Sequence, residues 1–250
     1  MLRITSLRPT VRWICWTGVL FCVSFLGAIS LALFLNLQTK GRAEDLLRAT
    51  RAIKTGESTT ADVQRLADRF HGRLNPYLRA SRCPSADSAY GVQIENGALN
   101  RLGGTIPFLR RLGLRPWGVA AMFLLQGGRV CFAQYAVGVY PLDEEPIFEL
   151  SATALPLGSD GFDPKYHSYS VGKRLHRGVC YFESEVAPEA TPEEKQHAFA
   201  FDFSCTTTMR GCLRISELAP LAWSDFSSRS KEQMWVSEHG EDKPSESYCK

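Results

Sequence analysis

Residues 13–37 read WICWTGVLFCVSFLGAISLALFLNL, 25 consecutive positions without an Asp, Glu, Lys, Arg or His. A helix rises ~1.5 Å per residue, so this stretch spans roughly 37 Å, enough to cross a hydrocarbon core of about 30 Å with some tilt. The sequence therefore predicts a transmembrane helix over residues 13–37, with the lipid bilayer as its partner.

A cleavable signal peptide is the alternative interpretation of the same stretch. Such a peptide has an apolar core of about 7–15 residues followed by a small-x-small cleavage site. Small residues do occur over 28–32, but they lie inside the apolar run, with LFLNL still to follow. The length favours an uncleaved signal-anchor.

The flanking charges predict the orientation of this helix. Three arginines and the amino terminus precede it in residues 1–12, where no acid occurs, whereas the basic residues at 40 and 42 are partly offset by acids at 44 and 45. By the positive-inside rule, residues 1–12 form a cytoplasmic arm. We expect a single-pass protein of the cell membrane whose C-terminal domain is extracytoplasmic.

Positive charge is concentrated at the N-terminal end of the chain, and this distribution bears on whether the protein binds nucleic acid. Residues 1–54 carry eight Lys and Arg against two Asp and Glu, and residues 55–250 carry 21 against 24. A nucleic-acid-binding domain presents a basic face. The near-neutral C-terminal part therefore predicts no nucleic-acid partner.

The apolar pattern divides the chain into five parts. Residues 44–54 either prolong the membrane helix or form a short stalk, and the polar, aperiodic residues after 226 indicate a flexible tail. The predicted parts are the arm (1–12), the transmembrane helix (13–37), a juxtamembrane stalk (38–56), one extracytoplasmic α+β domain (57–226) and the tail (227–250).

The clearest helix outside the membrane is expected over residues 59–71. Thr59 and Asp62 have the spacing of a capping box, and Gly72 follows as a stop. Apolar residues then recur at helical spacing, at Val63, Leu66, Ala67 and Phe70.

Several later stretches alternate with a period of two and predict strands. We expect a hairpin around Asn96-Gly97, a second around Gly127-Gly128, and further strands over 147–154, 166–171, 179–185 and 199–205. The predicted fold class is α+β, with one antiparallel sheet and one main packed helix after the transmembrane helix.

Six of the eight cysteines lie outside the membrane segment: Cys83, Cys131, Cys180, Cys205, Cys212 and Cys249. An even number in an exported domain permits disulfides. Cys205 and Cys212 are the candidate pair, because six residues suffice to turn the chain between them. The alternative is a longer bridge from Cys83 to one of the two. We interpret Cys131 and Cys180 as buried free thiols and Cys249 as unpaired.

No motif indicates a catalytic, cofactor-binding or metal-binding residue. The five histidines are scattered, and neither an HExxH segment nor a Gly-x-Ser-x-Gly or Walker motif occurs. We therefore predict no catalytic residues, no cofactor and no metal.

Four arginines surround aromatic residues between positions 101 and 117. This mixture suits lipid headgroups, although a solvated edge of the domain is the simpler interpretation. The residues are Arg101, Phe108, Arg110, Arg111, Arg115 and Trp117.

Residues 53–72, IKTGESTTADVQRLADRFHG, resemble the opening helix of BamE-like lipoproteins, in which Gly-x-Ser-Thr-x-x-[Asp/Glu]-Val precedes an antiparallel sheet. The chain lacks the lipobox cysteine of that family. Residues 203–220, FSCTTTMRGCLRISELAP, resemble uncharacterised bacterial single-pass membrane proteins with no assigned activity. The resemblance implies a small envelope domain.

Two function classes follow. The first is a membrane-anchored binding or structural module of the cell envelope, with a protein partner there. The alternative is a membrane-tethered, hydrolase-like enzyme whose site is assembled from sequence-distant residues, for example His167 or His176 with an acid and a nucleophile.

Overall fold

The computed structural model describes residues 9–74, 83, 85–97, 99–101, 109–110, 115–139, 148–154, 168–174, 179–187, 190–208 and 210–228. Of the predicted cytoplasmic arm it describes residues 9–12, and of the predicted tail only residues 227 and 228. Cys249, His167 and His176 lie outside these ranges.

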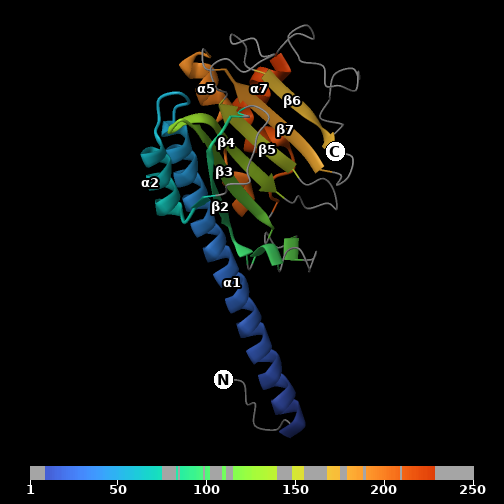
Figure 1. Cartoon of the computed structure of the whole chain (residues 1–250). Helices are drawn as coiled ribbons and strands as arrows, with labels where there is room; N and C mark the ends of the chain where they lie inside the picture. Colours follow the sequence, from blue (N-terminus) through green and yellow to red (C-terminus); the bar gives the residue numbers. More distant parts are fainter. Residues whose placement is uncertain are drawn as a thin grey trace.

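Helix α1 runs without a break from Pro9 to Ala52. Its N-terminal half carries exposed apolar side chains. Figure 1 shows the long blue helix projecting from the domain at its N-terminal half and lying along the domain at its C-terminal half. Of the two predicted alternatives for residues 44–54, the prolonged helix is observed. The segment predicted as a stalk enters the domain core, because Ala43, Leu46 and Leu47 are at most 4% exposed.

The strands form one mixed sheet in the order β1-β2-β3-β4-β5-β7-β6. Their bounds are β1 Arg73–Leu74, β2 Ser88–Glu95, β3 Trp117–Gln126, β4 Arg129–Val139, β5 Phe148–Ala154, β6 Ser168–Arg174 and β7 Val179–Val186. The α+β prediction is confirmed.

The sheet is not wholly antiparallel, because β5 and β7 pair in parallel. Parallel neighbours need a crossover connection. Here β6 supplies it by forming an antiparallel pair with β7 on the outer side, so that β7 lies between β5 and β6. Periodicity within each strand carries no information on this order.

The predicted hairpin at Asn96-Gly97 is wrong. The side-chain Oδ1 of Asn96 accepts a hydrogen bond from the backbone N–H of Leu99, and its carbonyl accepts one from Asn100. These bonds begin a helical turn. An Asn after a strand can cap a helical turn in this way instead of forming the turn of a hairpin. Strand β2 pairs with β3 instead.

The predicted hairpin at Gly127-Gly128 is confirmed as the β3–β4 turn. Both glycines have positive φ, 58° and 77°, which is the conformation that a two-residue turn of this kind requires. The β3–β4 register shifts between Leu124 and Leu125, which leaves Cys131 as the extra residue of a bulge in β4.

Helix α2, Thr60–Phe70, confirms the predicted helix and its capping box. The Asp62 carboxylate accepts from the backbone N–H and the hydroxyl of Thr59, and these hydrogen bonds lower the pKa of Asp62. The helix buries Val63, Leu66, Ala67 and Phe70. Its last turn closes on His71, which has a left-handed φ of 58°, and a side chain at Gly72 would collide with Val92.

The predicted strand over 199–205 is wrong, although Phe199 and Phe203 are buried as the alternation indicated. The backbone N–H groups of this segment bond locally or to the carbonyl of Leu218. The chain lies across the helix-covered face of the sheet and pairs with no described strand. The flanking helices are α5 Pro192–Ala198, η1 Ser204–Thr207, α6 Ile215–Leu218 and α7 Pro220–Ser228.

All these helices lie on one face of the sheet and share a single core with it. The opposite face has a small second cluster where Cys83 covers Ala89, Leu124 and Phe132. Among the described residues no helix covers the rest of that face, which we call the open face.

Candidate functional site

The open face is hollowed over its central strands. Strand register places Gly118 and Ala120 of β3 beside Gly138 and Ala136 of β4, so the two central strands present only small side chains there. Strand β2 on one side, and strands β5 and β7 on the other, present polar side chains level with these small residues. We call this hollow, of about 720 Å³, the trough.

The trough has polar sides. Each of its two walls carries a carboxylate, and an arginine lies at one end. Gln93 and Glu95 of β2 form one wall, and Ser151, Tyr181 and Glu183 of β5 and β7 form the other. Arg110 and Asn100 lie at the end where β2 stops. Glu95 accepts hydrogen bonds from the side-chain amides of Gln93 and Asn100, at 3.4 and 3.0 Å, which fixes its carboxylate at that end.

The described residues that line the trough offer hydrogen-bonding groups. The described residues that line the trough include no histidine or cysteine, so no imidazole stands beside Ser151 there. In the described part of the chain no group of three or more His, Cys, Asp or Glu could hold a metal ion. Carboxylates, amides and a phenol over a floor of small residues can hydrogen-bond a polar ligand.

A second hollow, of about 490 Å³, lies at the far end of the domain between the end of α1 and α5. Arg51 lies in it and donates two hydrogen bonds to the carbonyl oxygen of Phe199. Burial lowers the pKa of Arg51. Since its guanidinium is occupied by a backbone carbonyl, Arg51 primarily holds α5 against α1.

The junction between α1 and the sheet is built on one buried amide. Asn36, 1% exposed, donates from Nδ2 to the carbonyl of Thr206 at 3.2 Å and accepts at Oδ1 from the indole N–H of Trp117 at 2.6 Å. Higher on the helix, Tyr135 of β4 donates to the carbonyl of Ala43 at 2.9 Å. These bonds fix the domain rigidly to α1.

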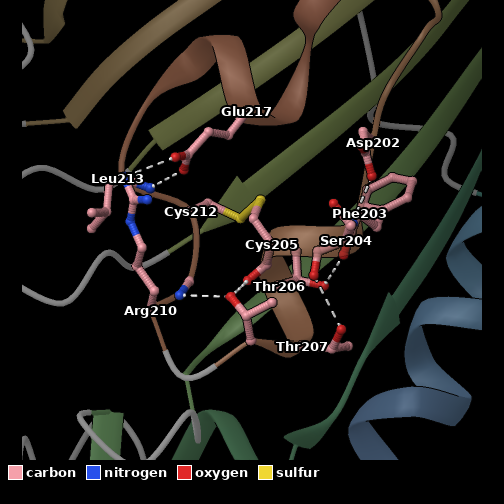
Figure 2. Close-up of a disulfide and its surroundings, with 12 residues drawn as sticks. Asp202, Phe203, Ser204, Cys205, Thr206, Thr207, Arg210, Cys212, Leu213 and Glu217 are labelled. Atoms are coloured by element: carbon pink, nitrogen blue, oxygen red, sulfur yellow. Dashed lines mark hydrogen bonds and ion pairs between the residues drawn. A yellow bond between two sulfur atoms is a disulfide. The ribbon is translucent and has the colours of Figure 1, made fainter.

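The structure joins Cys205 to Cys212 in a disulfide, with the two Cα atoms 4.9 Å apart (Figure 2). Cys205 begins the loop within η1 rather than at a strand end. The Glu217 carboxylate accepts from the backbone N–H of Leu213 at 2.7 Å and lies 3.4 Å from the Arg210 guanidinium. The loop is therefore tied to α6 as well as closed by sulfur.

Cys131 is not the free thiol that its apolar strand suggested. It is bonded to Cys83, 48 residues earlier, because the bulge turns Cys131 to the open face, where Cys83 lies. The proposed longer bridge from Cys83 to Cys205 or Cys212 is thereby also wrong. The side chain of Cys180 and all of Cys249 lie outside what the structure describes. Two disulfides indicate an oxidising compartment for the domain.

Two members of the predicted headgroup surface do not belong to it, because Trp117 and Arg115 are each 1% exposed. The Nε of Arg115 donates to the carbonyl of Arg110, and its guanidinium lies against Gly211, where a Cβ would collide with it. Arg101 is exposed and Arg110 is half-buried. Phe108 and Arg111 lie outside the described residues.

Of the described histidines, His197 lies beside two acidic side chains. Its Nδ1 lies 2.8 Å from an Asp225 oxygen, which ties α5 to α7, and its Nε2 lies 3.9 Å from Glu193. No spacing signal in the sequence identified this pair, or the residues of the trough.

Comparison of the chain with protein-family models, with curated proteins and with solved structures finds no match. One described helix, α1, is long and apolar enough to cross a membrane, and its most apolar window is wholly unburied. By length and composition alone, α1 fits a membrane anchor or a signal sequence.

Proposed function

We propose that the protein is a single-pass, membrane-anchored binding module of the cell envelope, with its N-terminal arm in the cytoplasm and its domain outside. The observation that carries this proposal is the trough. It is a polar hollow in a domain that is rigidly joined, through Asn36 and Tyr135, to an apolar helix.

The unbroken α1 supports an anchor over a signal peptide. Residues 32–50 of this helix supply core side chains, so the helix is an integral element of the domain. Cleavage within the apolar run would separate this part of α1 from the part that crosses the membrane. If the run is not cleaved, α1 connects the membrane to the domain as one continuous helix. The two disulfides support the extracytoplasmic location of the domain.

The charges of the trough favour a basic protein segment as its ligand. Glu95 and Glu183 lie on opposite walls, four strand spacings apart and one row offset, which corresponds to roughly 20 Å at ~4.8 Å per strand. An extended segment rises about 3.3 Å per residue, so basic side chains six positions apart would reach both carboxylates from the same side. Arg110 at the lower end selects against a uniformly basic segment.

Photo-crosslinking in intact cells tests this function. A photoreactive residue at Ala120 or Ala136, on the floor of the trough, should capture a protein through a Lys- or Arg-containing segment. The same group at Gln64, exposed on the outer side of α2, is the control. Replacing both wall carboxylates, Glu95→Gln with Glu183→Gln, should remove the adduct, and equal adducts at 64 and 120 would contradict the proposal.

A cysteine at Gln196, exposed on α5, tests the orientation. In a chain that also carries Cys180→Ser and Cys249→Ser, a membrane-impermeant thiol reagent should label the cysteine at position 196 in intact spheroplasts, whereas a cysteine at position 6 should be labelled only after lysis. The reverse pattern would place the domain in the cytoplasm.

A further inference from the structure

The position of the domain along α1 determines its height above the membrane. The lowest buried side chains on α1 are Ala32 and Asn36, while Leu31, Phe34 and Leu37 remain more than half exposed. Asn36 bonds Trp117 at the start of β3 and Thr206 in η1. The lower edge of the domain therefore lies between Ala32 and Asn36.

The hydrocarbon core ends at nearly the same height. About 20 helical residues span it, so a span that begins at Trp13 ends near residue 33, and one that begins at Trp16 ends near residue 36. Either count places Asn36 at or just above the hydrocarbon boundary, within the headgroup layer. Figure 1 shows the helix emerging directly from the lower edge of the domain.

Three arginines lie along this edge, at positions set by contacts with the junction. Asn100 accepts a hydrogen bond from the backbone N–H of Trp117, and Arg101 follows it in the chain. Arg110 is held through its carbonyl by Arg115, which packs on Gly211. Arg210, which precedes Gly211, therefore lies near the same edge. Its side chain is 67% exposed, and its guanidinium extends toward Glu217 (Figure 2).

We infer that the domain lies directly on the bilayer and that Arg101, Arg110 and Arg210 contact the phosphates of anionic phospholipids. The planar guanidinium donates two parallel hydrogen bonds to a phosphate, which suits this role. Two carboxylates share the edge, Glu95 with Asn100 and Glu217 with Arg210, and they limit the attraction. The inference rests on the proposed anchoring, and it places the trough just above the lipid surface.

Depth-dependent quenching tests this contact. The full-length protein is reconstituted into nanodiscs that contain nitroxide-headgroup lipid, with a fluorescent amino acid at Ser204 in η1 or at Gln196 in α5. The second position lies near Arg51, about 22 Å farther along α1 than Asn36 by helical rise. Quenching at 204 should exceed that at 196 at least threefold, and should increase when phosphatidylglycerol replaces phosphatidylcholine.

Charge-matched variants assign the effect to the lower edge. Arg101→Gln with Arg110→Gln and Arg210→Gln should abolish the increase with anionic lipid, whereas Arg48→Gln with Arg65→Gln and Arg69→Gln, on exposed sites of α1 and α2, should retain it. Excess inorganic phosphate should not reverse the increase, since the predicted ligand is lipid-bound phosphate. Reversal would indicate a site for free phosphate and overturn the lipid assignment.

Two other results would overturn the inference. Equal quenching at 204 and 196 would show that the domain does not touch the bilayer. Quenching at 204 that is the same with anionic and neutral lipid would refute the arginine contact. Retention in the nanodisc is measured first by co-elution. Loss of the protein from the disc would refute the anchoring itself, a result distinct from the other two.

Discussion

The indole N–H of Trp117 donates a 2.6 Å hydrogen bond to the side-chain oxygen of Asn36, so the first residue of β3 is bonded to helix α1. Both side chains are 1% exposed. A polar residue at the end of a 25-residue apolar run is thereby explained: Asn36 is a structural residue of the domain, and the last part of the run packs on the domain.

Replacing Asn36 with Ala should destabilise the domain strongly. The change leaves the buried Trp117 N–H and the Thr206 carbonyl without these partners, at a cost of roughly 1–3 kcal/mol for each buried group. Denaturant unfolding of the full chain in detergent, followed by Trp fluorescence, measures it. Gln38→Ala, two residues along and exposed, should change stability by less than ~0.5 kcal/mol. Equal effects of the two changes would remove Asn36 from the core.

Phe70→Ala should cost about 3–5 kcal/mol, because the ring is 4% exposed beneath α2 and its removal leaves a cavity. The control is Gln64→Ala on the solvent side of the same helix, where no core contact is lost. Thermal or denaturant unfolding measures both. An unchanged midpoint for Phe70→Ala would mean that α2 does not pack on the sheet.

The two disulfides should differ in their contribution to stability. In the chain-entropy estimate, a bridge between residues seven apart restricts the unfolded chain by roughly 2 kcal/mol and one between residues 48 apart by about 4 kcal/mol. Cys205→Ser with Cys212→Ser should therefore be the milder double variant, and both should keep the far-UV spectrum of the sheet. The reverse order of midpoints would contradict this explanation.

Peptide mapping without reduction checks the connectivity on which that comparison depends. Proteolysis of the purified protein should release one peptide pair joined through Cys83 and Cys131, and another joined through Cys205 and Cys212. A peptide joining Cys83 to either cysteine of the short loop would contradict the observed pairing.

Stability should fall at high pH through Tyr135. Burial raises the pKa of this phenol well above its ordinary value of 10.0. A group with a raised folded-state pKa contributes stability that is fully present below the unfolded-state pKa, near 10, and that is lost as the pH rises through the folded-state value. Urea unfolding from pH 8 to 11 should therefore show a decline that Tyr135→Phe reduces.

The same variant at pH 8 gives the internal reference for that experiment. There it loses only the hydrogen bond to Ala43, worth about 1 kcal/mol. If the unfolding free energy declines equally with pH above pH 10 in wild type and variant, the ionisation of Tyr135 does not cause the decline.

The sequence by itself determined the local features whose causes lie within a few residues. The apolar run 13–37 required a long helix, the Thr59–Asp62 spacing and the Val63–Phe70 stripe fixed α2, and Gly127-Gly128 fixed the β3–β4 turn. Each is controlled by backbone sterics, capping or amphipathic period, which act over one or two turns of chain. The candidate pair Cys205 and Cys212 was accessible for the same reason, since only six residues separate them.

Only the tertiary structure decided what depends on neighbours distant in sequence. Strand order is one example, because β7 inserts between β5 and β6 for reasons that no single strand encodes. Cys131 is another, since one bulge residue turns its side chain toward Cys83. The trough likewise arises when four small residues from β3 and β4 come into register beneath polar walls from three other strands, and that register exists only after the sheet has formed.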